Sequence, residues 1–268
     1  MDWGLGISLA PFDADLALAQ QLADAAGAVS LSYFRRELQS WSKEDGSLAT
    51  EADLAVEDEL RTRLKLERLN DAVLGEERGQ TGSGRRRWIL DGIDGTVDFA
   101  AGSPNWATLI ALEADGRIVV SVCDEPAHQR RYWAMRGGGA FCSHVPFFDQ
   151  KQLNVSTIRD LATARSYVPP PMRLRDDRAR RVADIVSRST TPRSHADHPA
   201  LLVAMGGSEL ALFLTGGPWD LAGPSLIVEE AGGRFTDLAG KYDLTSGTAI
   251  FSNGFLHDDI VRLCVERS

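Results

Sequence analysis

Apolar positions along the chain follow two periodicities, one helical and one strand-like. Residues 13–38 carry apolar side chains three to four positions apart, beginning at Leu16, and this spacing predicts a helix. A loop or ribbon is expected over 42–53. Val56 and Leu60, with the apolar residue four positions further on, predict a second helix.

The middle of the chain reads as β-structure. Residues 107–113 and 117–123 are apolar runs, and the Asp-Gly pair within 114–116 is typical of a hairpin turn. The Gly- and Arg-rich stretch 78–87 is expected to be a mobile loop. Residues 219–231 look like a helix that ends at a Gly-Gly pair.

Length and composition fit a globular protein with a full core. The chain has 268 residues, of which 43% are hydrophobic and 25% charged. We expect two lobes of one unit. Residues 1–150 would form an N-terminal α+β lobe with the metal-binding motifs, and 151–268 a C-terminal α/β lobe that completes the active site.

Charge and cysteine content exclude several classes of protein. The net charge of −9 disfavours binding to nucleic acid, and the arginines at 85–87 are better explained as a solvated surface than as an RNA-binding patch. Three scattered cysteines indicate reduced thiols. With neither a membrane span nor a signal peptide in the sequence, we expect a soluble, cytoplasmic protein without membrane partners.

Three acidic segments are candidates for chemistry: Gly75-Glu76-Glu77, residues 91–96 and Trp219-Asp220. Hard carboxylate oxygens suit magnesium, and Asp91 and Asp94 could turn toward one point if the chain bends at the glycine between them. Taken singly, each segment has a plainer explanation. Asp-Gly pairs form turns, an Asp can cap a helix, and a Glu-Glu pair is usually solvated.

Together the segments resemble one family. G-E-E at 75–77, W-I-x-D-x-I-D-G-T-x-x-F at 88–99, and a W-D…E-A-G-G stretch from 219 to 233 are similar to the motifs of the inositol monophosphatases, in the same order and spacing. The resemblance implies a layered α-β-α-β-α sandwich of the α+β class, which fits the alternation of elements described above. It also implies a metal-dependent phosphatase that acts on a small phosphate ester and forms a homodimer.

The resemblance also assigns residues. It implies two or three Mg²⁺ ions, with Mn²⁺ as a substitute, bound by one carbonyl and four carboxylates: Ile93, Glu76, Asp91, Asp94 and Asp220. Thr96 and Asp53 match the pair that activates the attacking water, and Glu77 matches an acid that positions it. Thr96 belongs to the substrate site as well, for which the further candidates are Gly95, Asp98, His195 and Asp197.

Departures from the family pattern bear on the substrate. Asp98 stands where the family usually has asparagine, Gly92 where it has proline, and Phe213 where some inositol phosphatases carry a substrate-binding acid. Segments 106–112 and 129–134 look most like histidinol-phosphate phosphatases of actinobacteria. L-histidinol phosphate is therefore the first expectation. Inositol 1-phosphate or another cyclitol, sugar or nucleoside monophosphate is the alternative, and an inactive metal-binding regulator is a distant one.

Overall fold

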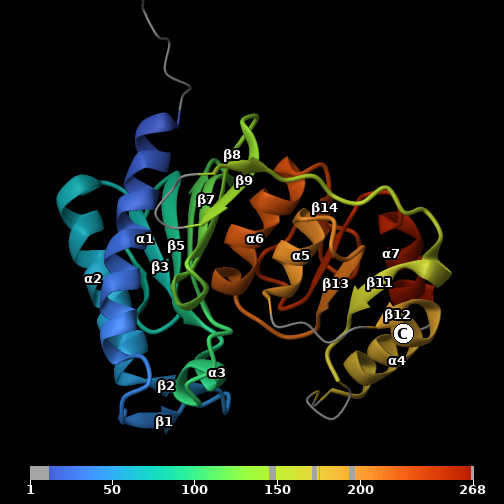
Figure 1. The fold of residues 1–268 in the computed structure, drawn as a ribbon, viewed down its shortest axis with the longest axis horizontal. Helices are drawn as coiled ribbons and strands as arrows, with labels where there is room; N and C mark the ends of the chain where they lie inside the picture. The colour runs from blue at the N-terminus through green and yellow to red at the C-terminus, as the bar shows by residue number, and fades with distance from the viewer. Residues whose placement is uncertain (1–11, 145–148, 171–173, 175, 193–196, 267–268) are drawn as a thin grey trace, which may run out of the picture.

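The computed structural model describes residues 12–144, 149–170, 174, 176–192 and 197–266. Helices and sheets alternate in five layers (Figure 1). In the order of the layers they are an outer helix pair, a large sheet, a central helix pair, a small sheet and a second outer helix pair. This arrangement confirms the α-β-α-β-α sandwich expected from the sequence. Among the described residues, no helix is long and apolar enough to cross a membrane.

The large sheet has eight strands in the order β10-β9-β8-β7-β6-β5-β3-β4. Their bounds are β3 Ala72–Gly75, β4 Gly79–Thr81, β5 Arg86–Asp94, β6 Ala107–Ala114, β7 Arg117–Glu125, β8 Arg130–Met135, β9 Gly139–His144 and β10 Lys151–Gln152. The outer helices α1 (Asp13–Tyr33) and α2 (Glu51–Glu67) cover one face. Their apolar stripes form one core cluster with that face, which includes Leu22, Leu60 and Trp88.

The small sheet has five strands in the order β12-β11-β13-β15-β14. Their bounds are β11 Arg165–Tyr167, β12 Thr191–Pro192, β13 Leu210–Phe213, β14 Arg234–Thr236 and β15 Ala249–Ser252. The helices α4 (Asp177–Ser189) and α7 (His257–Glu266) cover its outer face. A separate core cluster, which includes Val182 and Ile260, lies between those helices and the sheet.

The central layer joins the two sheets. It consists of α5 (Pro199–Ala204) and α6 (Pro218–Glu230). Helix α6 is apolar on nearly all sides and fully buried from Leu221 to Val228, as expected for a helix between two sheets. The predicted helix over 219–231 is confirmed, with Gly232 at a φ of 90° just beyond its end.

Smaller elements complete the fold near the edge of the large sheet. The predicted ribbon is a hairpin of β1 (Ser40–Ser42) and β2 (Leu48–Thr50), and a short helix α3 (Thr96–Ala100) follows β5. The predicted hairpin at 114–116 is confirmed, because Asp115 and Gly116 both have positive φ, at 51° and 77°.

Two expectations about local structure were wrong. The first helix ends at Tyr33 rather than near residue 38, because Phe34 is extended and Arg35 has a φ of 60°. The stretch 78–87 is not a single loop. Residues 79–81 pair with β3, and Arg86 belongs to β5, where its guanidinium bonds the Asp71 carboxylate at 3.0 Å.

Candidate functional site

Three carboxylates converge where β5 ends beside the first turn of α6. One oxygen from each of Asp91, Asp94 and Asp220 lies within 4.8 Å of the other two. Two of these residues lie on β5, and Asp220 is the third residue of α6. Its carboxylate also accepts a hydrogen bond from the Gly217 N–H at 2.5 Å, so it caps the helix while lying in the cluster.

A β-bulge brings the two β5 aspartates to one side. Asp91 pairs with Leu109 and Asp94 with Ala107, so β5 holds one residue more than β6 over this interval. The Gly92 carbonyl accepts the Thr108 hydroxyl at 2.8 Å. A Cβ at Gly92 would lie 3.2 Å from the Asp53 carbonyl oxygen, so glycine allows α2 to pack closely against the bulge.

The negative charges of the three aspartates are poorly compensated by their surroundings. Burial, with repulsion from neighbouring carboxylates, raises the pKa of Asp91 well above its usual range, that of Asp94 to about 6 and that of Asp220 to about 7; for Asp94 the repelling neighbour is Asp98. Among the described residues, Asp91 Oδ2 has no hydrogen-bond partner although it is buried. A buried carboxylate oxygen without a partner fits a bound cation, since a cation would supply both the charge and the missing coordination.

Glu76 and Glu77 lie at the edge of the cluster and share a lysine. Lys43 Nζ is 2.6 Å from Glu76 Oε1 and 2.5 Å from Glu77 Oε1. Burial raises the pKa of Glu76 to about 7; Lys43 opposes the rise, and Asp220 and Asp94 add to it. The acidic pair is therefore turned toward the site and is not a solvated surface pair.

A buried glutamate that sequence reasoning missed holds this acidic pair in place. Glu57 accepts hydrogen bonds from the Glu77 N–H at 2.7 Å and the Arg78 N–H at 3.1 Å. A Cβ at Gly75 would lie 2.2 Å from Glu57 Oε1, which explains the glycine of the G-E-E motif. The acid occupies a core-facing helical position three residues before Leu60, and that placement was the available sequence signal.

Thr96 and Asp53 are joined directly. The Thr96 hydroxyl lies 2.9 Å from Asp53 Oδ1 and 3.1 Å from the Ile93 carbonyl oxygen, its two available acceptors. The other Asp53 oxygen accepts from the Thr50 N–H and hydroxyl in a capping box at the start of α2. Both residues are thus fixed by backbone elements before any ligand binds.

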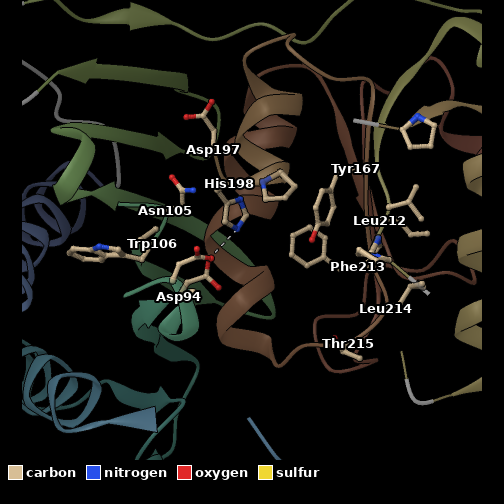
Figure 2. Close-up of a pocket in the computed structure, with 18 of the residues that line it drawn as sticks. Asp94, Asn105, Trp106, Tyr167, Asp197, His198, Leu212, Phe213, Leu214 and Thr215 are labelled. Atoms are coloured by element: carbon tan, nitrogen blue, oxygen red, sulfur yellow. Dashed lines mark ion pairs between the residues drawn. The ribbon is translucent and has the colours of Figure 1, made fainter. Parts of the chain in front are cut away.

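A pocket of about 730 Å³ opens beside Asp94 (Figure 2). Of the predicted substrate residues, Gly95, Asp98 and Asp197 line it, whereas Thr96 is turned toward Asp53. His195 lies outside the described residues. The Asp98 side chain is exposed at the pocket wall, and α3 has no side-chain capping hydrogen bond at its N-terminus.

Two further pocket residues went unrecognised in the sequence. His198 is buried, stacks on Phe213 with ring centroids 5.9 Å apart, and places Nε2 3.7 Å from Asp94 Oδ2 (Figure 2). Burial lowers its pKa to about 4, so the ring is neutral at physiological pH. Glu125, the last residue of β7, also lines the pocket and is buried. No metal-ligand spacing marks either residue.

Comparison with known proteins places these features in a family. Residues 13–268 match the model of the inositol monophosphatase family. The chain is 40% identical over 257 residues to a histidinol-phosphatase of Mycobacterium tuberculosis, covering 92% of this chain and 96% of that one. It is 38% identical over 255 residues to a histidinol-phosphatase of Streptomyces coelicolor, covering 92% of this chain and 95% of that one.

Solved structures show the same fold. The extragenic suppressor protein suhB of Bartonella henselae superposes with a TM-score of 0.82 at 26% identity, over 94% of this chain and 99% of that one. The chain belongs to the inositol monophosphatase family, as its motifs indicated. It is a phosphoric monoester hydrolase of the metal-dependent kind.

Proposed function

We propose that this protein is a Mg²⁺-dependent phosphatase whose substrate is a small cationic phosphate ester, with L-histidinol phosphate as the first candidate. The observation that carries the metal part is the convergence of Asp91, Asp94 and Asp220 around a buried oxygen without a partner among the described residues. Glu76 and the Ile93 carbonyl would complete the set for two or three ions, and Mn²⁺ would substitute. When bound, the cations neutralise phosphoryl charge and lower the pKa of water.

The chain's own residues supply positioning. Asp53 accepts the Thr96 hydroxyl hydrogen, which leaves the hydroxyl oxygen free to accept a hydrogen bond from the attacking water. Glu77, held by Lys43, would help to position the same water. Gly95 has a φ of 86°, and a Cβ there would lie 3.0 Å from the Asn105 carbonyl oxygen. Glycine therefore lets the chain turn tightly beside the metal ligands, where its N–H can donate to a phosphate oxygen.

The pocket wall supports a cationic substrate. Asp98 and Asp197 add two carboxylates to it, and neither is in the aspartate cluster. Phe213 stacks on His198 where some inositol phosphatases carry a hydroxyl-binding acid. Relatives named histidinol-phosphatase at 38–40% identity point the same way, because histidinol phosphate carries an ammonium group and inositol phosphate does not.

We further propose that the enzyme is a cytoplasmic homodimer. Free cysteines support the reducing compartment: Cys123 and Cys264 are buried thiols, and Cys142 is partly buried and unbridged. The dimer rests on the family resemblance. Size-exclusion chromatography with light scattering would measure the mass in solution against the 29.2 kDa of one chain.

The test of the proposed function is phosphate release across a panel of monoesters. L-histidinol phosphate, inositol 1-phosphate, a hexose phosphate and a nucleoside monophosphate would be compared with Mg²⁺, with Mn²⁺ and with chelator. We expect histidinol phosphate to give the highest kcat/KM and chelator to abolish all turnover. Undiminished turnover in chelator would refute the metal mechanism, and a preference for inositol 1-phosphate would promote the cyclitol alternative.

A further inference from the structure

Sheet register connects the aspartate cluster to a second acidic position in the same pocket. Asp94 on β5 pairs with Ala107 on β6, and Thr108 pairs with Asp124 on β7. Extending that register by one residue places Glu125 beside Ala107. Glu125 therefore lies two strands away from Asp94 along the sheet, a backbone separation of about 9–10 Å. Both residues line the pocket, so a small metabolite can reach from one to the other.

Glu125 is buried and incompletely bonded. Glu125 is 3% exposed, and within the described part of the chain its Oε2 has no hydrogen-bond partner. The nearest cation is Arg130, whose Nε lies 3.7 Å from that oxygen, beyond hydrogen-bonding distance. The backbone N–H of His198, at the start of α5, partly opposes the rise in the pKa of this carboxyl.

The negative charge around Glu125 is not fully neutralised, so one more cation would be stabilised there. Arg130 Nη2 forms an ion pair with Asp197 Oδ1 at 3.2 Å, and another nitrogen of this guanidinium, Nη1, donates to the Tyr132 hydroxyl at 3.0 Å. Among the residues that the structure describes, Arg130 is the cation that contacts both carboxylates. Burial raises the pKa of Glu125 to about 7 and Arg130 only partly opposes it, while Asp197 adds to the rise. One guanidinium thus does not compensate two carboxylates.

The rest of the pocket explains what kind of molecule would carry that cation. Tyr167, Leu212 and Phe213 form an apolar wall facing His198 and Asp197 (Figure 2). Trp106 borders the pocket as well, and its buried Nε1 is without a partner among the described residues. A ligand with an apolar or planar body and a polar end would fill this space.

We propose that Glu125 binds a cationic nitrogen on the leaving group of the substrate and thereby selects ammonium-bearing phosphate esters over neutral esters of the same size. This inference rests on the proposed phosphatase function and goes beyond it, because it assigns specificity to a residue outside the motifs. The phosphate lies at Asp94 and the cation at Glu125, so the register of three strands sets the distance between the two groups.

A hydroxyl group would be a poorer ligand for this position. It donates a hydrogen bond to Glu125 but leaves the second carboxylate without a counter-charge. An ammonium group supplies both the donor and the charge. Charge-assisted hydrogen bonds exceed neutral ones by an amount that corresponds to roughly a ten- to hundredfold preference.

The experiment compares matched esters on matched variants. The probes are ω-aminoalkyl phosphates of two to six carbons and their ω-hydroxyalkyl counterparts, and the readout is the amine-to-hydroxyl ratio of kcat/KM. Glu125→Gln removes the charge and keeps the shape. Glu113→Gln is the control, since Glu113 lies near the other end of β6 and pairs with Arg87 at 2.8 Å.

We expect the wild type and Glu113→Gln to favour the amine by about ten- to a hundredfold at the best chain length, and Glu125→Gln to bring the ratio near one. A wild-type ratio near one, or a ratio that Glu125→Gln leaves unchanged, overturns the inference while the phosphatase function stands. If no ester is hydrolysed with any divalent metal, the proposed function itself fails. Calorimetry with the free amino alcohols in chelator then decides: binding that Glu125→Gln abolishes supports the cation site, and absence of binding overturns it.

Discussion

The Thr96 hydroxyl lies 2.9 Å from Asp53 Oδ1, although the two residues are 43 positions apart in the sequence. Asp53 is anchored by its capping box at the start of α2, and Thr96 begins α3 directly after β5. Because α2 packs closely over the bulge at Gly92, this contact ties the helix layer to the strand that carries Asp91 and Asp94. The proposed roles of both residues depend on this contact.

Replacing Thr96 should therefore affect turnover more than metal binding. Thr96→Ala removes the hydroxyl that we propose to orient the attacking water, and we expect kcat to fall by about 10²–10³. The Mg²⁺ dissociation constant should stay within about threefold, since no carboxylate is lost. Steady-state kinetics and calorimetry measure the two quantities. Thr96→Ser, which keeps the hydroxyl, is the matched control, and a Thr96→Ala variant that loses metal with normal kcat at saturating metal would contradict this role.

Removing one carboxylate of the aspartate cluster should give the opposite pattern. Asp94→Asn takes one charge from the three oxygens that lie within 4.8 Å of one another. We expect metal affinity to fall at least about tenfold and turnover by orders of magnitude. Asp115→Asn, in the exposed β6–β7 turn where Asn tolerates the positive φ, should change neither. Unaltered metal binding in Asp94→Asn would exclude this residue from the ligand set.

Local motifs made part of the site predictable. Asp91 and Asp94 lie in one short segment, so a bend at the glycine between them could turn both carboxylates toward one point. Asp220 is brought to them by the packing of α6 between two sheets, which no local pattern encodes. Its place in the cluster could be expected only because the whole set of motifs resembled a family.

Residues whose role depends on long-range packing were missed. Glu125 follows an apolar strand and looks like an ordinary polar terminus until the sheet register places it beside Ala107. His198 precedes a helix of six residues, and nothing in its neighbours shows that it will stack on Phe213. Helix α4 was not expected from the sequence, because it buries only Val182, Ala183 and Val186.

The close approach at Gly75 gives a prediction about stability and the acidic pair together. In Gly75→Ala the new Cβ would lie 2.2 Å from Glu57 Oε1, and Glu57 is buried and holds two backbone N–H groups. We expect a loss of about 1–3 kcal/mol in the free energy of unfolding and weaker metal binding, because Glu76 moves with the loop. Urea denaturation and calorimetry check both effects.

Gly207→Ala is the control for that substitution, because its Cβ would make an ordinary contact of 3.4 Å with Leu202. It should shift stability by less than about 1 kcal/mol. If Gly75→Ala were equally mild, Glu57 would have to be free to move, and its proposed hold on Glu76 and Glu77 would be wrong.

The last prediction concerns pH and a histidine far from the cluster. His257 is fully buried at the start of α7, with Nδ1 2.8 Å from the Ser252 hydroxyl and Nε2 2.8 Å from the Thr236 hydroxyl. Burial lowers its pKa from 6.5 to about 4, so the folded protein keeps the ring neutral. The unfolded chain takes up a proton below about pH 6.5, and stability therefore falls as the pH drops from there toward 4. At pH 5 the loss from this group is about 2 kcal/mol relative to pH 7.5.

Urea denaturation at both pH values should show that His257→Gln loses less stability on acidification than the wild type, by about that amount. His144→Gln, at the exposed end of β9, should behave like the wild type. An equal loss in the wild type and His257→Gln would show that this ring is not held neutral by the fold.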